Sequence, residues 1–167
     1  IANGVHLPQL SKLEGVEIAA LCDVNPKALA ETGDKYGVPE GRRFTDYRQL
    51  IACPEVDAVD ICTPNYLHSV IAVDAFAAGK HVLVEKPMAG DMEQAREMLA
   101  LEQPGAPVTM IAENFYYRKS VLTAAEWIHS GKIGTPTAAL VQVLSHFSRD
   151  AKWLVESDWR RDCVGGI

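Results

Sequence analysis

The sequence has no cluster of lysine and arginine and no long run of apolar residues. Its 167 residues carry a net charge of −6 with a pI of about 5.3, which is unlike the strongly basic balance of a nucleic-acid-binding domain. The longest nearly apolar stretch, residues 70–78, contains Asp74 and is far shorter than the roughly 20 residues that span a bilayer. We therefore expect neither nucleic acid nor a membrane as a partner.

Cysteine pairs are also missing. The four cysteines form no C-x-x-C motif and no spacing typical of a metal site. Cys22 and Cys62 fall in expected strands, which favours buried free thiols in a reducing compartment. The sequence thus predicts no metal ion and a cytoplasmic protein. Because the chain begins at Ile1 rather than Met, this expectation leaves a preceding signal peptide open.

What the sequence does contain is an alternation of apolar runs and helical patterns. Strands are expected at residues 16–24, 42–46, 58–62, 81–85 and 107–113, and helices at residues 25–37, 46–53, 68–79, 91–102 and 120–131. The strand runs are apolar enough to be covered on both faces. Strands that alternate with helices predict a parallel sheet with crossover helices, an α/β fold.

Local signals mark the ends of two of these helices. Asn25 can cap the helix over residues 25–37, Pro26 suits its first turn, and Gly37 suits its C-terminal end. Asp91 and Gln94 have the spacing of a capping box at the start of the helix over residues 91–102.

The pattern changes after residue 134. Residues 137–147 read as a long strand that no helix follows. We therefore expect an α/β domain over residues 1–134 and, over residues 135–167, the start of an α+β domain with a mostly antiparallel sheet.

Polar residues and prolines follow several of the expected strands. They are Asp23, then Thr63, Pro64 and Asn65 with His68 close behind, then Glu85, Lys86 and Pro87, and finally Glu113 and Asn114. In open parallel sheets, ligands bind beyond the carboxyl ends of the strands. The sequence therefore predicts a single site built from these strand ends.

Asp23 ends the first expected strand. A dinucleotide-binding fold places an acid about 20 residues after its glycine turn, where it binds the ribose hydroxyls. If Ile1 and Ala2 are the last two positions of G-x-G-x-x-A, Asp23 lies 21 residues past Ala2. The glycines of that motif are not in the chain. The alternative is an aspartate that caps a helix or closes a turn.

Four stretches resemble one known family. "DVN", "DAVDICTPNYLH", "AAGKHVLVEKPMA" and "SGKIGTP", in this order, are similar to the Gfo/Idh/MocA family, which includes glucose–fructose oxidoreductase, inositol dehydrogenase and dihydrodiol dehydrogenases. The resemblance covers essentially the whole chain. It implies a doubly wound six-stranded Rossmann sheet whose first, central strand is missing here, NAD (or NADP) as cofactor, and an internal fragment of a longer enzyme.

The resemblance gives the E-K-P stretch a role. It implies that Lys86 is catalytic, with an ammonium that donates to the substrate oxygen and stabilises the charge that develops there during hydride transfer. Glu85 would hold Lys86 or touch the cofactor. Pro87 would fix the backbone and is a candidate for a cis peptide bond. The alternative is a surface ion pair beside a proline that starts a helix.

The remaining site residues are also implied by the resemblance. The cofactor would be bound by the residues Ala2, Asp23, Thr63, Pro64, Asn65, His68, Glu85, Pro87 and Asn114. The substrate would be reached by the residues Tyr117, Arg118, Trp159 and Arg160. For His68 the alternative is a helix-start histidine bound to the main chain, and for the last four it is packing. His6, His129 and His146 have no partner that the sequence identifies.

Together these features predict an enzyme. We expect an NAD(P)-dependent oxidoreductase that transfers a hydride between the nicotinamide and a hydroxyl or keto carbon of a sugar, cyclitol or related diol. The alternative is a regulatory protein of the same family that binds a dinucleotide without turnover. A third reading, a Rossmann-like domain that binds nothing, conflicts with the matched strand-end motifs. We also expect a homo-oligomer formed through the second domain.

Overall fold

The computed structural model describes residues 1–142, in which the chain forms two compact units, one over Ile1–Ala112 and one that begins at Glu113. The first unit contains two parallel sheets. Strands β1 (Leu21–Cys22) and β2 (Arg43–Phe44) form one, and β3 (Ala58–Ile61), β4 (His81–Val84) and β5 (Thr109–Ile111) form the other, in that order. The predicted α/β fold with a parallel sheet is confirmed.

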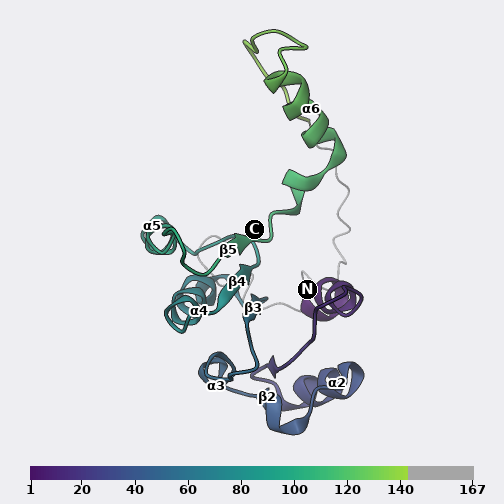
Figure 1. The fold of residues 1–167 in the computed structure, drawn as a ribbon, viewed down its shortest axis with the longest axis vertical. Coiled ribbons are helices and arrows are strands. Elements are labelled where there is room, and N and C mark those ends of the chain that lie inside the picture. The colour runs from purple at the N-terminus through teal and green to yellow at the C-terminus, as the bar shows by residue number, and fades with distance from the viewer. Residues whose placement is uncertain (143–167) are drawn as a thin grey trace, which may run out of the picture. The chain divides into compact units, whose positions relative to one another are not determined.

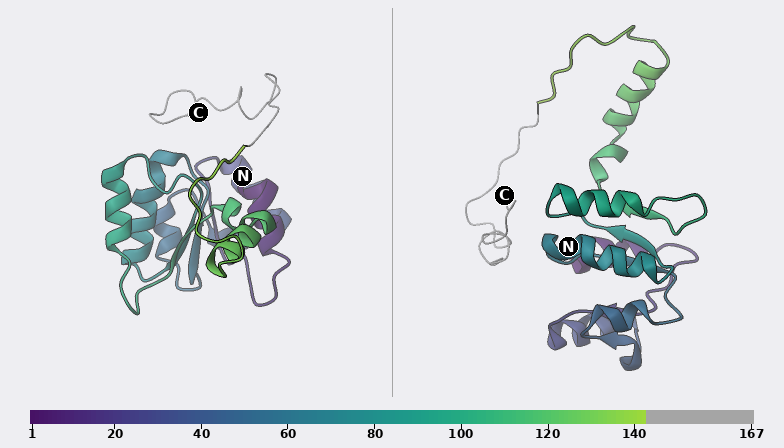
Figure 2. Two further views of the ribbon diagram at one scale, coloured as in Figure 1. Left: turned by 90° about the horizontal axis from the view of Figure 1, so that it is seen from above. Right: turned by 90° about the vertical axis from the view of Figure 1, so that its left-hand side faces the viewer.

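Helices connect these strands. The helices of the first unit are η1 (Ala2–His6), α1 (Leu7–Leu10), α2 (Pro26–Tyr36), η2 (Glu40–Arg42), α3 (Tyr47–Ile51), α4 (Asn65–Ala77) and α5 (Met92–Ala100). Helices α4 and α5 cover one face of the β3–β4–β5 sheet, and the N-terminal helical segment lies on the other (Figure 1; Figure 2, left). Helices on both faces make this a doubly wound arrangement.

The ends of helix α2 follow from its sequence. The Asn25 side chain accepts hydrogen bonds from the N–H groups of Lys27 and Ala28, as an N-cap does. Pro26 occupies the first turn, where its missing N–H costs nothing. Gly37 ends the helix at φ +70°, a conformation that residues with a side chain rarely adopt. All three assignments were predicted.

Other predicted boundaries need correction. The strand expected over residues 16–24 is limited to Leu21–Cys22, because β1 has a ladder partner, β2, on one side only. In the described part of the chain no ladder joins β1 to β3, and this is where the family resemblance predicts a further central strand. Helix α4 begins at Asn65, three residues before the predicted start, because Pro64 is its extended N-cap.

The predicted capping box of α5 is only half formed. Asp91 caps the helix as expected and accepts from the N–H groups of Glu93 and Gln94. The Gln94 side chain, however, accepts from the Gly90 N–H and from the Ser69 hydroxyl instead of the N–H of Asp91. The glutamine thus ties α5 to α4 rather than closing its own cap.

The core lies between the β3–β4–β5 sheet and helices α4 and α5. Its central members are Val59, Ile61, Ile71, Ala72, Ala75, Val82, Val84 and Met98. Alternate residues of a strand point to opposite faces. Because Ile61 and Val84 face this core, the neighbouring Asp60 and Glu85 face the other side of the sheet, toward the N-terminal helical segment.

Replacing Ile61 with valine tests this core. Ile61 is only 2% exposed, so the lost methylene leaves a small cavity, and we expect the free energy of unfolding to fall by about 0.5–1.5 kcal/mol. Val24→Ala removes more atoms than Ile61→Val does, but the Val24 side chain is 87% exposed. We therefore expect this control to change the free energy of unfolding by less than about 0.5 kcal/mol. Urea denaturation measures both. Equal effects would contradict the packing described here.

The second unit contains η3 (Asn114–Tyr117) and α6 (Lys119–His129). Residues 136–142 form neither helix nor strand, so the strand expected over residues 137–147 is not seen in its described part, and the remainder lies outside the described residues. A domain boundary at residue 134 and an antiparallel second sheet stay predictions. Within residues 1–142, no helix is both long and apolar enough to cross a membrane.

Candidate active site and cofactor site

Two of the predicted loops lie at one edge of the sheet. Strands β3 and β4 are parallel and in register, with Ile61 opposite Val84. Thr63–Asn65 follows β3, and Glu85–Pro87 follows β4. Because the carboxyl ends of parallel strands meet at the same edge, the two loops are neighbours, as the sequence predicted.

The side chain of His68 contacts both of these loops. Its side chain is buried, with 1% exposure. Its Nδ1 atom lies 2.7 Å from the carbonyl oxygen of Pro87, and its Nε2 atom lies 2.8 Å from that of Thr63. Both ring nitrogens therefore have main-chain partners, which is the alternative role that the sequence left open. Any contribution of His68 to a cofactor site is made through the loops it holds.

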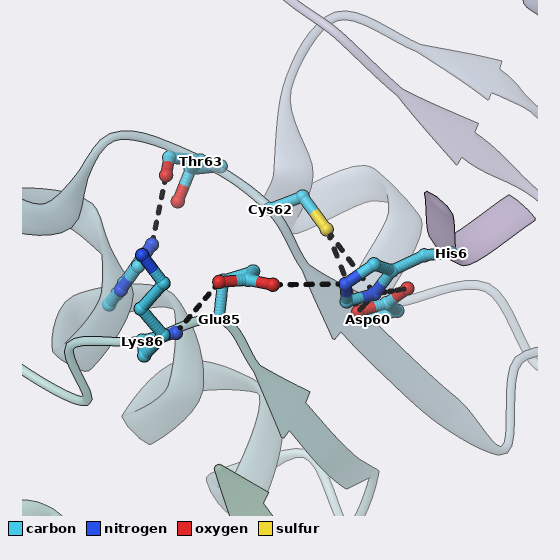
Figure 3. Close-up of polar contacts among 7 residues, drawn as sticks. His6, Asp60, Cys62, Thr63, Glu85 and Lys86 are labelled. Carbon is cyan, nitrogen blue, oxygen red and sulfur yellow. Dashed lines mark hydrogen bonds and ion pairs between the residues drawn. The ribbon is translucent and has the colours of Figure 1, made fainter. Parts of the chain in front are cut away.

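Glu85 does not pair with the ammonium of Lys86. One carboxylate oxygen, Oε2, accepts from the main-chain N–H of Lys86 at 3.0 Å, and the other, Oε1, lies 3.1 Å from Nε2 of His6 (Figure 3). The Lys86 side chain is exposed, and no residue among 1–142 pairs with its Nζ atom. The predicted cis bond between Lys86 and Pro87 is confirmed. The alternative of a Glu85–Lys86 surface ion pair is not what the structure contains.

His6 is a site residue that the sequence did not reveal. It ends η1, and its Nδ1 atom lies 3.0 and 2.9 Å from the two carboxylate oxygens of Asp60 on β3 (Figure 3). Its partners lie 54 and 79 residues away along the chain. No local pattern marks such a contact, so only the fold brings the three side chains together.

The thiol of Cys62 lies beside the cluster that His6 forms with Asp60 and Glu85. Its Sγ atom lies 3.6 Å from Nδ1 of His6. Burial, and then the negative charges of Asp60 and Glu85, raise the pKa of Cys62 to about 12. His6, Asp60 and Cys62 have the donor types of a cation site. In the structure, though, Asp60 already binds the ring nitrogen, and a thiol of such high pKa is a poor ligand. We therefore treat the cluster as a hydrogen-bonded one.

Cys62 should react slowly in the folded protein. Its raised pKa leaves far less thiolate near pH 8 than in the unfolded chain, although the thiolate that forms is more nucleophilic. Together these effects predict reaction with an aromatic disulfide reagent about 30-fold slower than in urea. Mass mapping of the Cys62 peptide over time measures the rate. Equal rates in the folded and unfolded chain would show that the thiol is neither buried nor near these carboxylates.

Asp23 has a local role that leaves part of its carboxylate available. It directly follows β1, as predicted, and its Oδ1 atom accepts from the N–H of Asn25 at 2.8 Å. Asn25 is itself the cap of α2, so the turn orients the carboxylate. Asp23 remains exposed, and no interaction among residues 1–142 uses its Oδ2 atom. Ala2, the other predicted residue near the glycine turn, opens η1.

Two predicted site residues of the second unit, Tyr117 and Arg118, pack against neighbouring aromatic rings. The Arg118 guanidinium lies 3.8 Å from the centre of the Phe115 ring, and Tyr117 meets Tyr116 edge to face, with ring centres 5.2 Å apart. Asn114 is exposed. A role for Asn114, Tyr117 or Arg118 at the site stays a prediction. Trp159 and Arg160 lie outside the described residues.

Comparison with known proteins assigns the family. The Gfo/Idh/MocA model, described as an oxidoreductase family with an NAD-binding Rossmann fold, matches residues 2–111. The chain belongs to the Gfo/Idh/MocA family. The resemblance predicted from the strand-end motifs is confirmed, and so is the expected dinucleotide-binding fold.

Individual members of the Gfo/Idh/MocA family are similar to the chain in sequence and in structure. The chain is 35% identical over 114 residues to levoglucosan dehydrogenase of Pseudarthrobacter phenanthrenivorans, covering 68% of this chain and 29% of the relative. It is 32% identical over 143 residues to D-apiose dehydrogenase of Paraburkholderia graminis, covering 85% and 37%. The crystal structure of the WlbA dehydrogenase from Bordetella pertussis with NADH and UDP-GlcNAcA superposes with a TM-score of 0.72 at 25% identity, covering 80% and 38%.

The chain spans about a third of the length of these Gfo/Idh/MocA relatives. Its residues fit the dinucleotide of the family. An oriented carboxylate with an unused oxygen follows β1, and two loops tied together by a buried histidine follow β3 and β4. Acceptors for ribose hydroxyls and a cation beside a reacting carbon are the groups that such a cofactor needs.

Proposed function

We propose that the protein containing this chain is an NAD(P)-dependent oxidoreductase that acts on a hydroxyl or keto carbon of a sugar, cyclitol or related diol. The observation that carries the proposal is the placement of Lys86. Its exposed ammonium, unpaired within residues 1–142, follows β4 at the sheet edge where a dinucleotide fold binds its ligands. The named activities of the relatives, on levoglucosan and D-apiose, support the substrate class.

Each residue then has a part. Asp23 would accept from the ribose hydroxyls of NAD, while Thr63, Pro64 and Asn65 and the E-K-P turn would line its nicotinamide end. The bound cofactor supplies the hydride acceptor or donor. Lys86 would donate to the substrate oxygen and stabilise the negative charge that develops on it. His68 would keep the two loops at a constant separation through its contacts with Thr63 and Pro87.

Turnover of sugars and cyclitols by the full-length protein tests the proposal. We expect NADH to bind with a change in its fluorescence, and NAD⁺ to be reduced in the presence of at least one of levoglucosan, D-apiose and myo-inositol. NADH binding with no turnover of any probe would favour the alternative, a regulatory protein that binds the dinucleotide. Absence of NADH binding would overturn both.

Three further properties belong to this proposal. We propose that residues 135–167 begin the substrate domain and that the protein forms a homo-oligomer through it. In support, the described part of residues 135–167 exposes the apolar side chains of Leu140 and Val141, and apolar surface of this kind commonly lies in an interface. A cytoplasmic location is supported by the free thiols of Cys22 and Cys53. Light scattering on the full-length protein tests the oligomer.

A further inference from the structure

The imidazole of His6 joins two charged carboxylates from different strands. Only 10% of its side chain is exposed, against 22% for Asp60 and 14% for Glu85, so little water competes for the contacts. All three side chains belong to the first unit, and they lie on the face of the sheet opposite the α4–α5 core (Figure 3). His6 thus connects η1, β3 and the end of β4 at a single point.

Hydrogen-bond chemistry then sets the protonation of the ring. A carboxylate oxygen only accepts, and an imidazole donates from both nitrogens only when each carries a hydrogen. Nδ1 of His6 faces Asp60 and Nε2 faces Glu85. The ring can donate to both ionised carboxylates only when each nitrogen carries a hydrogen, and it then places one positive charge between two negative ones. Charge-assisted hydrogen bonds of this type are stronger than neutral ones.

Glu85 connects His6 to the main chain of Lys86. One oxygen of Glu85 binds His6, and the other accepts from the main-chain N–H of Lys86. We propose that His6 is a positioning residue for Lys86: it holds the Glu85 carboxylate in the orientation that fixes the main chain of the lysine. On the other side of the turn, His68 binds the carbonyl of Pro87. This inference rests on the proposed function for the role of Lys86, but not for the contact itself.

Removing the ring's proton donor toward Glu85 has two consequences. The carboxylate loses the group that orients it, and it then lies near Asp60 with no cation between them. Two neighbouring carboxylates repel each other, so Glu85 is expected to turn away and release the N–H of Lys86. A small displacement of a catalytic group is enough to lower a rate substantially.

Two substitutions separate the contacts of His6. In His6→Asn the amide nitrogen takes the place of Nδ1 and keeps a donor toward Asp60, whereas in His6→Gln it takes the place of Nε2 and keeps a donor toward Glu85. Each variant loses the positive charge and the contact on one side of the ring, and urea denaturation of both shows how far their stabilities differ. We expect kcat of His6→Asn to fall about tenfold and that of His6→Gln to fall clearly less, with KM for the polyol similar in both.

Hydrogen exchange gives a readout that needs no turnover. In the full-length protein without cofactor, the Lys86 amide should exchange several-fold faster in His6→Asn than in His6→Gln. If the two variants have equal Lys86 exchange, or if His6→Gln exchanges faster, the positioning role is wrong and His6 only ties η1 to the sheet.

Parallel measurement of Lys86→Ala separates this inference from the proposed function. The kinetic probes are NAD⁺ with levoglucosan, D-apiose or myo-inositol. If Lys86→Ala keeps its kcat, or if the wild type turns over none of the probes, the proposed role of Lys86 fails, while the exchange data still decide whether His6 orients Glu85. If Lys86→Ala is inactive but the two His6 variants are alike in kcat and exchange, only the positioning role fails.

Discussion

Replacing Lys86 with alanine is expected to lower kcat of the full-length enzyme by roughly 10²–10³-fold. Loss of one donor that stabilises charge in a transition state typically costs about 2.7–4 kcal/mol. The structure supports this role because the ammonium is exposed, has no partner among residues 1–142, and projects from a turn held at Glu85 and Pro87. The affinity for NADH should stay within a few-fold, since a dinucleotide is bound along its whole length.

Steady-state kinetics and NADH fluorescence titration measure the two quantities separately. Lys86→Arg serves as the matched variant: it keeps the charge but replaces a compact ammonium with a planar fork, so we expect it to be impaired as well. If Lys86→Ala instead keeps its kcat and loses NADH affinity, the lysine binds the cofactor, and charge stabilisation belongs to residues outside this chain.

Replacing Asp23 with asparagine is expected to weaken the preference for NADH over NADPH. We expect the ratio of the two dissociation constants to change by about 10- to 100-fold. The carboxylate would accept from both ribose hydroxyls and repel a 2′-phosphate, and hydrogen bonds to charged groups are worth about 1.5–3 kcal/mol. The residues that follow, Val24 and Asn25, offer no cation for that phosphate. Asparagine keeps an oxygen for the N–H of Asn25, so the turn itself should survive.

Dissociation constants for both cofactors, measured on the wild type and the variant, test this role of Asp23. Glu31→Ala removes a different exposed acid, on helix α2, and should leave the ratio of the two constants unchanged. A wild-type protein that binds NADPH more tightly than NADH would contradict the expectation outright. An unchanged ratio in Asp23→Asn would leave Asp23 as a turn residue only.

The elements that could be predicted are those whose signals are local. Helix α2 carries its cap, its proline and its terminal glycine within a few residues of its ends, and each was found where the sequence placed it. Strand β1 was predicted too long, because a strand exists only where a neighbouring strand pairs with it. The residues of β1 alone do not indicate how far that pairing extends. The Gln94 side chain was assigned to a cap, but tertiary packing turned it toward Ser69.

In the candidate site, too, the local motifs were predicted and the long-range contacts were not. Asp23, the T-P-N loop and the E-K-P turn were predicted together, because parallel strands bring their carboxyl ends to one edge. The sequence also left two uses open for His68, and the structure shows both of its ring nitrogens bound to main-chain carbonyls. His6 had no predicted partner at all, although it contacts Asp60 and also Glu85, which binds the main chain of Lys86.

By itself, then, the sequence determined the alternation of strands and helices, the strand ends that carry polar residues, and the family to which those motifs belong. These depend on residues within about a dozen positions of one another. Only the tertiary structure decided which carboxylates His6 binds, which loops His68 joins, and that Glu85 holds the main chain of Lys86 rather than its ammonium. Those contacts link residues from different elements, and their geometry exists only after the sheet and its helices have packed.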